Sequence, residues 1–281
     1  MVYFFHKTLF LKENIMKQIT DTLSSLILKA GEIMLKAHDI ESGDHMSEKA
    51  GDAANLVTVY DVAVQNFLIT EITNLLPDAY FIAEEKENDA ESLNRKYCFV
   101  IDPIDGTANF THNYKHSCIS LALFSYGEVV FAAVYDPYLK ELFTARKGEG
   151  AFVNGKPIRV AERDAAHSIV AFGTSPYYKD TLGEKSFRLC QTLFKKCSDL
   201  RRCGAAALDL AYVAAGRNDM FFECLLSPWD IAAGYLLIKE AGGKMSDMLG
   251  NEICFSAPSS VIAASATVYD TLLEVSKEIM A

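Results

Sequence analysis

Apolar residues recur at intervals of three and four along the first part of the chain. Between residues 16 and 38 this spacing predicts an amphipathic helix that packs one face against a core. The polar stretch over 39–52 contains glycine and predicts a flexible loop. A second helix is predicted over 62–76, with Asp61 placed to cap its first turn.

Shorter apolar runs further along the chain predict strands, because they are brief and are bounded by turn-forming residues. In the first half, strands are expected over 80–83, 97–101, 118–125, 128–135 and 141–146, followed by a hairpin at 154–155. In the second half, strands are expected over 169–173, 199–202, 220–223 and 261–264, alternating with helices over 183–196, 205–215, 230–241 and 267–280.

This change of pattern predicts an α+β half over 16–150 and an α/β half over 151–281. No linker rich in proline, glycine and serine separates the halves, so we expect one compact unit with a packed seam near residue 150. Residues 1–15 precede the clean helical pattern. Their apolar run is too short for a signal peptide core. Because Met16 opens a cleaner helical pattern, we expect residues 1–15 to be a dispensable extension, disordered or read from an upstream start codon.

Composition and charge narrow the possible functions. The formal net charge is −10 and no run of lysine and arginine occurs, which disfavours binding to nucleic acid through a basic face. No run approaches the ~20 apolar residues of a membrane-spanning helix. The seven cysteines show no Cys-x-x-Cys pair, so we expect reduced, mostly buried thiols in a cytoplasmic protein.

The segment DPIDGTANF, which begins at Asp102, directly follows a predicted strand. Its two carboxylates, Asp102 and Asp105, repel each other at a strand end unless a positive charge lies between them. Mg²⁺ supplies such a charge and prefers oxygen ligands. Gly106 lets the backbone approach a ligand closely, and the amides of Gly106 and Thr107 offer a seat for phosphate at an expected helix start.

Three weaker acidic signals also stand at strand ends or helix starts, where sites form in layered α/β folds. Glu84 and Glu85 follow the predicted strand 80–83, although a solvated loop explains two adjacent acids equally well. Asp61 and Asp230 each stand at the start of a predicted helix, and each is equally explained as a helix cap.

The Asp102 segment resembles the first signature of the inositol monophosphatase family, within the superfamily of lithium-sensitive, metal-dependent phosphatases. Residues 229–234 (WDIAAG) are similar to that family's second signature, and the resemblance extends from about residue 16 to the C-terminus. It implies a layered αβαβα sandwich, a homodimer and a Mg²⁺-dependent phosphomonoesterase. Lithium sensitivity is expected from the resemblance alone.

The resemblance also implies metal ligands. Glu84, Asp102 and the backbone carbonyl of Ile104 would hold a first Mg²⁺. Asp102, Asp105 and Asp230 would hold a second Mg²⁺. A third ion, more weakly bound, would be coordinated by Glu84. Two metals about 3.5–4 Å apart can clamp the attacking and leaving oxygens of a phosphate ester in line.

Roles in catalysis follow from the same resemblance. Thr107, hydrogen-bonded to Asp61, would orient and deprotonate the attacking water. Glu85 would lie behind the metal ligands, and Lys49 would lie near the metals on a mobile loop. No cysteine, serine or histidine nucleophile stands in a motif, so we expect direct transfer to water without a covalent intermediate.

The substrate site that the resemblance implies consists of Asp105, Gly106, Thr107, Ala206, Glu223 and Asp230. The Glu223 carboxylate can accept two hydroxyl hydrogen bonds from a polyol, although a surface acid at a strand end explains it too. This residue favours an inositol or sugar phosphate over a nucleotide as the small-molecule phosphate ester.

Two positions depart from the family pattern. Ala83 stands where the family mostly has glycine, and Ala205 stands where a small hydroxylated residue is common. Neither is an expected metal ligand, so the departures bear on specificity. We interpret His112 and His116, which lie near the site in sequence, as polar loop residues.

Other functions stay open at this point. A fructose-1,6-bisphosphatase or a 3′(2′),5′-bisphosphate nucleotidase would use the same scaffold. A transcription-factor-binding protein is a non-enzymatic alternative, because some bacterial relatives are thought to assist RNA polymerase. The pair Arg201-Arg202 in an acidic chain agrees weakly with that alternative.

Overall fold

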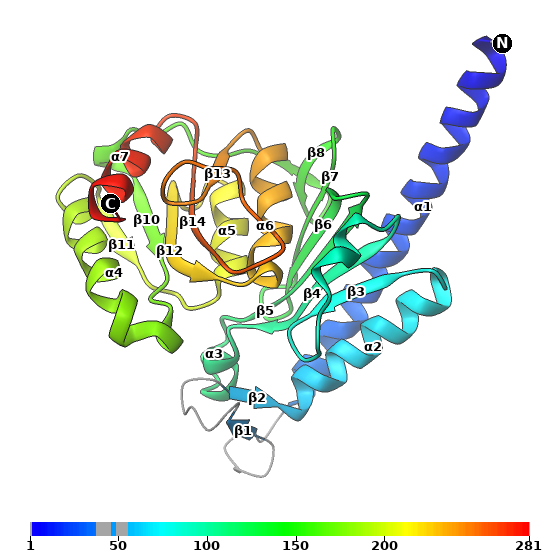
Figure 1. Ribbon diagram of the computed structural model, residues 1–281, viewed down its shortest axis with the longest axis horizontal. Coiled ribbons are helices and arrows are strands. Elements are labelled where there is room, and N and C mark those ends of the chain that lie inside the picture. Colours follow the sequence, from blue (N-terminus) through cyan, green and yellow to red (C-terminus); the bar gives the residue numbers. More distant parts are fainter. Residues whose placement is uncertain (1, 38–45, 49–55, 281) are drawn as a thin grey trace.

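Layers of helices and sheets alternate through the molecule, in the order helices, sheet, helices, sheet, helices (Figure 1). The structure is a computed structural model that describes residues 2–37, 46–48 and 56–280. Separate apolar clusters fill the spaces between successive layers. The layered αβαβα sandwich expected from the sequence is confirmed.

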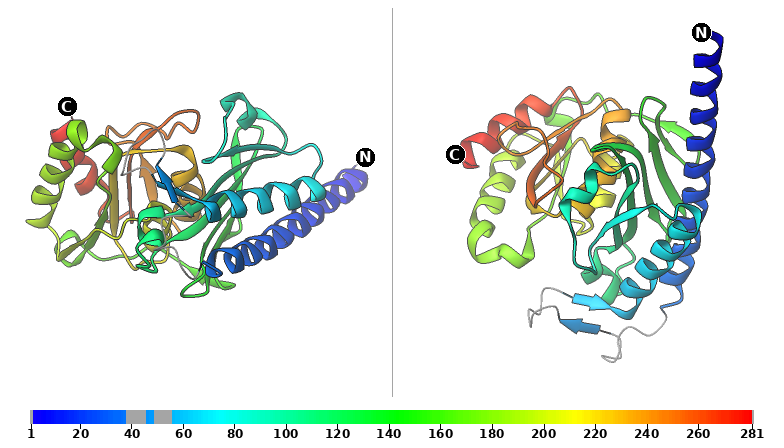
Figure 2. Two further views of the ribbon diagram at one scale, coloured as in Figure 1. Left: turned by 90° about the horizontal axis from the view of Figure 1, so that it is seen from below. Right: turned by 45° about the vertical axis from the view of Figure 1, so that its right-hand side comes forward.

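The first helical layer covers one face of the larger sheet (Figure 2). It consists of α1 (Val2–Leu35) and α2 (Val59–Leu75). Leu23 and Ile27 of α1 are fully buried, as the spacing of apolar residues predicts. Helix α1 continues back to Val2, where it projects from the rest of the molecule (Figure 1).

Residues 2–15 are therefore helical, which differs from the disordered extension that we expected. No proline or glycine interrupts the sequence over 2–30, so nothing in it ends the helix before Met16. Whether the protein needs this segment stays a prediction.

The expected loop over 39–52 lies mostly outside the described residues. Its described part, β1 (Met46–Glu48), pairs antiparallel with β2 (Leu56–Thr58). The apolar pattern did not predict either of these short strands.

The larger sheet contains β3 to β9 in sequence order. Their bounds are β3 (Tyr80–Ala83), β4 (Cys98–Asp105), β5 (Cys118–Ser125), β6 (Glu128–Asp136), β7 (Glu141–Arg146), β8 (Gly150–Val153) and β9 (Lys156–Ile158). Strands β3 and β4 are parallel, and the others pair antiparallel. Because β9 ends at Ile158, the first half extends beyond the boundary expected near residue 150.

The middle layer holds α5 (Ala206–Ala214) and α6 (Pro228–Glu240), which contact strands of both sheets. The smaller sheet has the order β11-β10-β12-β14-β13. Its strands are β10 (Ile169–Phe172), β11 (Asp199–Arg201), β12 (Met220–Leu226), β13 (Lys244–Ser246) and β14 (Ser259–Ala264). The outer layer holds α4 (Lys179–Phe194) and α7 (Tyr269–Met280).

Short helical segments complete the described chain. These are α3 (Thr107–Thr111) and the 3₁₀ turns Ala90–Asn94, Ala165–His167 and Pro176–Tyr178. The strands and helices predicted from the apolar pattern are all present. Their ends shift by a few residues, except that α1 begins fourteen residues earlier than predicted. Strand β13, only three residues long, was not predicted. Within the described ranges no helix has the length and apolar character needed to cross a membrane.

Candidate functional site

The carboxylates of Asp102 and Asp105 lie where the pairing of β4 with β5 shifts register. Asp102 pairs with Ser120 and Asp105 pairs with Cys118, so three steps along β4 face two steps along β5. Side chains alternate across a strand, so residues three apart would otherwise point to opposite faces. The bulge therefore lets both carboxylates face the same side.

Asp230 joins these two carboxylates from the first turn of α6. One carboxylate oxygen from each of Asp102, Asp105 and Asp230 lies within 4.8 Å of the other two. Burial raises the pKa of Asp102 and Asp230 well above the usual range and that of Asp105 to about 6, and repulsion from neighbouring carboxylates, Glu84 among them, adds to the rise. A cation between these groups would relieve that repulsion.

Asp61 and Asp230 have the same local role in their helices. Each stands at the third helical position and completes a capping box, accepting a hydrogen bond of 2.7 Å through Oδ2 from the N–H of Thr58 or Ser227. The cap occupies one carboxylate oxygen and fixes the side chain. The same two aspartates also reach the site. Each therefore serves as a helix cap and as a site residue, two roles that the sequence presented as alternatives.

Thr107 begins helix α3 directly after Gly106, whose φ is 84°. A Cβ at Gly106 would lie 3.1 Å from the carbonyl oxygen of Gly204, so both the conformation and the space favour glycine. Thr107 Oγ1 lies 3.1 Å from the Ile104 carbonyl oxygen and 3.5 Å from Asp61 Oδ1. Burial raises the pKa of Asp61 to about 7, in the range where a carboxyl group can exchange a proton at neutral pH.

The residues on both sides of Glu84 form backbone hydrogen bonds with amide side chains. Gln65 of α2 accepts a hydrogen bond from the Glu85 N–H (2.9 Å) and donates one to the Glu85 carbonyl (3.0 Å). Asn88 makes the equivalent pair with the Ala83 N–H (2.9 Å) and carbonyl (2.8 Å). The backbone on either side of Glu84 is therefore fixed. The sequence alone did not reveal Gln65, because a buried glutamine on a helix carries no local signal of its distant partner.

The N-terminus of α5 holds Asp105 in place. The backbone N–H groups of Ala206 and Ala207 donate to the two Asp105 carboxylate oxygens at 3.2 and 2.8 Å. Both groups belong to the first turn of the helix, where N–H groups have no partner within the helix. Ala206, expected to contact substrate, thus also orients a metal-ligand candidate.

Glu223 lies in β12 and lines the same cavity. Its carboxylate accepts a hydrogen bond from the Ser175 N–H at 2.8 Å, and burial raises its pKa to about 7. A Cβ at Gly173 would come within 1.9 Å of Glu223 Oε2, so glycine makes the space for this carboxylate. Arg202, which the sequence did not place in the site, lies near enough to counter that rise in pKa.

One cavity gathers most of the predicted site residues. Its lining includes Glu84, Asp102, Ile104, Asp105, Gly106, Thr107, Ala206, Glu223 and Asp230, together with Arg202 and Asp209. Asp61 contacts Thr107 from behind this lining, and Glu85 is held by Gln65. Lys49 lies outside the described residues. The fold and the site thus define a class of protein in which carboxylates line a cavity that can hold metal ions.

Comparison with known proteins agrees with this class. The sequence pattern of the inositol monophosphatase family matches residues 15–281, and the chain belongs to this family. Family membership supports a phosphatase, and it accords with an acidic cluster that can bind metal.

Individual relatives extend the comparison. The chain is 39% identical to the Nus factor SuhB of Escherichia coli strain K12 over 246 residues, which cover 87% of this chain and 90% of that protein. Among solved structures, the IMPase of Thermotoga maritima has a TM-score of 0.80 at 34% identity, covering 92% of this chain and 97% of that one. The extragenic suppressor protein SuhB from Bartonella henselae has a TM-score of 0.81 at 32% identity, with coverage of 95% and 98%.

Proposed function

We propose that the protein is a Mg²⁺-dependent phosphomonoesterase acting on inositol monophosphate or a similar polyol or sugar phosphate. The observation that carries this proposal is the group of Asp102, Asp105 and Asp230, whose ligand atoms lie within 4.8 Å of one another in a cavity. Membership of the inositol monophosphatase family supports the same reaction class.

The donor set fits Mg²⁺, because the clustered ligands are all carboxylate oxygens. Asp102, Asp105 and Asp230 would hold one ion, and Glu84 with the Ile104 carbonyl would complete the ligands of another that shares Asp102. We propose two or three ions per chain. When bound, Mg²⁺ would supply positive charge that acidifies water and balances the charge developing on the phosphate ester.

The chain's own residues would move the proton and hold the phosphate. Thr107 Oγ1 would take a proton from the attacking water and pass its own to Asp61 Oδ1, which lies 3.5 Å away. The pKa of Asp61, raised to about 7 by burial, suits a base that works near neutral pH. Backbone N–H groups of Gly106 and Thr107 would donate to phosphate oxygens as charge accumulates on them.

Glu223 would select the alcohol part of the substrate. Its carboxylate is held in the cavity wall by Ser175, and a free lone pair can accept from the hydroxyls of a polyol. A nucleoside offers fewer adjacent hydroxyls, so we rank a polyol phosphate above a bisphosphate nucleotide, and fructose-1,6-bisphosphate stays the alternative among sugar phosphates.

A phosphate-release assay on the full chain tests the proposal. Inositol monophosphate, fructose-1,6-bisphosphate and adenosine 3′,5′-bisphosphate are compared while Mg²⁺ is titrated, with EDTA as the metal-free control. We expect Mg²⁺-dependent release, fastest with inositol monophosphate. Absence of Mg²⁺-dependent release from all three substrates would sink the phosphatase assignment.

The variant Glu223→Gln tests the substrate class separately. We expect its KM for inositol monophosphate to rise about tenfold, equivalent to about 1.4 kcal/mol of binding. With p-nitrophenyl phosphate, which has no polyol hydroxyls, the variant should behave like the natural chain. An equal change in KM for both substrates would show that Glu223 does not determine specificity.

A second candidate is the transcription-factor-binding protein that the sequence left open. The observation that favours it is the name Nus factor, which the Escherichia coli relative carries. Binding of the full chain to purified bacterial RNA polymerase and Nus factors, measured with the natural chain and with Asp105→Asn, tests it. Equal binding by both forms would show a role independent of turnover, and no binding would exclude this candidate.

A homodimer and a cytoplasmic location complete the proposal. Lithium inhibition belongs to it as well, and a titration of Li⁺ in the phosphate-release assay checks it. Sedimentation velocity of the full chain distinguishes a dimer from a monomer.

A further inference from the structure

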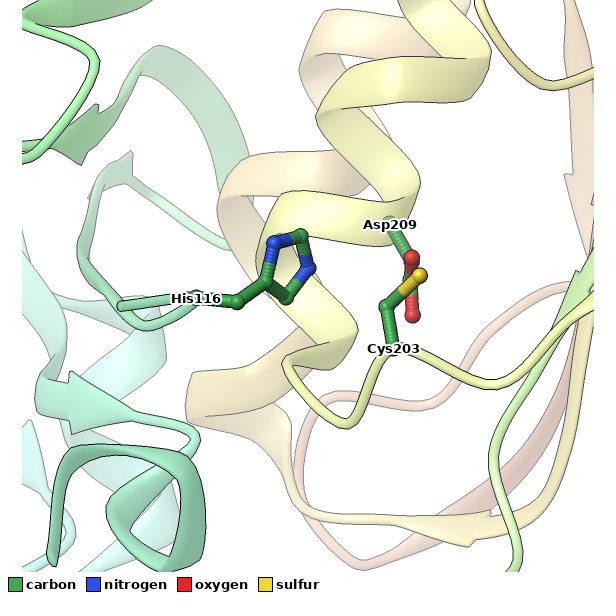
Figure 3. Close-up of side chains that lie close together, drawn as sticks. All are labelled: His116, Cys203 and Asp209. Atoms are coloured by element: carbon green, nitrogen blue, oxygen red, sulfur yellow. The ribbon is translucent and has the colours of Figure 1, made fainter. Parts of the chain in front are cut away.

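Three side chains of different donor chemistry meet beside helix α5 (Figure 3). One ligand atom from each of His116, Cys203 and Asp209 lies within 4.8 Å of the other two. His116 comes from the segment between α3 and β5, Cys203 from the segment before α5, and Asp209 from α5 itself. In Figure 3 the imidazole ring turns toward the thiol and the carboxylate.

The backbone around this group is fixed by Asn109. Its side-chain amide donates to the carbonyl of His116 at 2.7 Å and to the carbonyl of Cys203 at 2.8 Å. The same amide thus joins two segments that are far apart in sequence. Two of the three donor residues are therefore positioned before any ligand binds, which lowers the cost of ordering them.

Two polar atoms of the group have no hydrogen-bond partner in the described part of the chain. These atoms are His116 Nε2 and Asp209 Oδ1. Asp209 is only 1% exposed, so its carboxylate cannot turn to bulk water. Unpartnered buried polar atoms cost free energy, and their presence in a cluster indicates an absent ligand.

We propose that His116, Cys203 and Asp209 form a site for a transition-metal ion of the zinc class. An imidazole nitrogen, a thiolate and a carboxylate suit Zn²⁺ and Co²⁺, whereas Mg²⁺ prefers oxygen donors alone. Three protein ligands leave a fourth tetrahedral position for water or a small ligand. The site goes beyond the proposed hydrolase reaction, because none of its three side chains belongs to that mechanism.

The site shares a wall with the proposed active site. Asp209 lines the carboxylate cavity, and the residues His116 and Cys203 are partly exposed. Cys203 also precedes the turn whose N–H groups hold Asp105. The two sites differ in donor chemistry, so excess Mg²⁺ fills one and leaves the other for a softer ion.

Cobalt spectroscopy tests the proposal on the full chain. Reduced, metal-free protein is placed in excess Mg²⁺ and titrated with Co²⁺. We expect the near-ultraviolet absorption of a thiolate bound to cobalt, saturating at one ion per chain. Cys203→Ser should abolish this absorption, while the exposed Cys254→Ser should retain it. Loss of the signal in both variants, or in neither, would overturn the proposal.

Cys118 needs a separate control because its sulfur lies 3.6 Å from Asp105 Oδ2 in the other site. Cys118→Ala should leave the cobalt absorption unchanged. If it removed the signal, the cobalt would be in the carboxylate cavity and the proposal would be wrong.

Zinc binding gives a second readout that does not depend on sulfur spectroscopy. Equilibrium dialysis in excess Mg²⁺ should find one zinc ion per chain, with an affinity reduced about a hundredfold or more in His116→Gln. Circular dichroism confirms that each variant is folded. If Asp209→Asn fails to fold, Cys203→Ser and His116→Gln keep the test decisive, because their side chains are partly exposed. Unchanged zinc affinity in these two folded variants would contradict the site.

Discussion

Two groups of residues around buried carboxylates in this protein have opposite charge balance. Asp219, fully buried before β12, accepts hydrogen bonds from Arg163 Nε at 2.9 and 3.1 Å and from the Ile169 N–H at 2.8 Å. The carboxylates of Asp102 and Asp105 gather with Asp230, and no ion pair joins any of the three within the ranges that the structure describes.

The difference separates a structural carboxylate from a functional one. At Asp219 the chain supplies its own cation, and the pair joins the segment before β10 to the start of β12. At the cluster the described residues supply carboxylates, backbone N–H groups and the Cys118 thiol but no cation that pairs with them, so a metal ion from solution can supply the balancing charge. Removing a residue from the first group should cost stability, and removing one from the second should cost activity.

The largest effect is expected from Asp105→Asn. The change removes one negative charge from the cluster and replaces an acceptor of two backbone N–H groups. Phosphate release at saturating Mg²⁺ should fall at least about 100-fold, which corresponds to about 2.7 kcal/mol of transition-state stabilisation. Asp199→Asn, at an exposed position, is the matched control and should keep full activity. Retention of more than about a tenth of the natural rate would contradict the assigned role.

The next effect is expected from Arg163→Met. It leaves Asp219 buried without its cation, which should lower the free energy of unfolding by about 2–3 kcal/mol, a discounted figure because Arg163 is 43% exposed. Calorimetry should show a lower Tm, while phosphate release per folded molecule stays unchanged. Arg201→Met, whose partner Asp199 is exposed, should leave Tm unaltered. A loss of activity in folded Arg163→Met would contradict the claim that the Asp219 group is structural and not functional.

A smaller effect is expected from pH in the metal-free protein. Burial raises the pKa of Asp61 and Glu223 to about 7 and that of Asp105 to about 6, so the folded chain binds more protons than the unfolded chain between about pH 4 and pH 7. The stability contributed by these groups is present below about pH 4 and is lost as pH rises through 6 to 7.

Melting curves at pH 5 and pH 8 measure this dependence. In EDTA, Tm should be higher at pH 5. In excess Mg²⁺ the difference should shrink, because a bound cation favours the ionised carboxylates. If the metal-free protein had a higher Tm at pH 8 than at pH 5, the site carboxylates would not be destabilising when ionised. That result would contradict the assignment of this cluster as one that needs a cation.

The smallest effect is expected from Gln65→Leu. The change removes two hydrogen bonds that hold the Glu85 backbone next to Glu84. Each bond contributes about 1 kcal/mol, so we expect the Mg²⁺ concentration for half-maximal activity to rise about fivefold, with a limited fall in the maximal rate. The same assay on Asn88→Leu, which frees the other side of Glu84, should give a shift of the same sign. No shift in either variant would show that the position of Glu84 does not depend on these amides.

Local patterns were enough to predict most elements of the fold. The three- and four-residue spacing of α1 and the brief apolar runs of β3 to β7 depend on neighbouring residues alone, so they are visible in the sequence. The DPIDGTANF segment was equally visible because its residues are contiguous. Strand β13 was not found, because its three residues contain a single apolar side chain and its pairing partner lies elsewhere in the chain.

The residues of the candidate site likewise fall into those that the sequence revealed and those that only the structure revealed. Asp61 and Asp230 were recognised at helix starts, but the sequence left cap and site as alternatives. The tertiary structure shows that one oxygen of each carboxylate completes a capping box while the side chain still reaches the site. Gln65 and Arg202 were missed because their partners are distant in sequence.

The sequence by itself determined most of the segments that form helices and strands, and it placed acidic residues at their ends. Only the tertiary structure decided which of those ends meet. The bulge that turns Asp102 and Asp105 to one side, and the packing that brings α6 and α5 beside them, depend on strand register and on layer stacking. Both arise from contacts between residues far apart in the chain, which a local pattern does not encode.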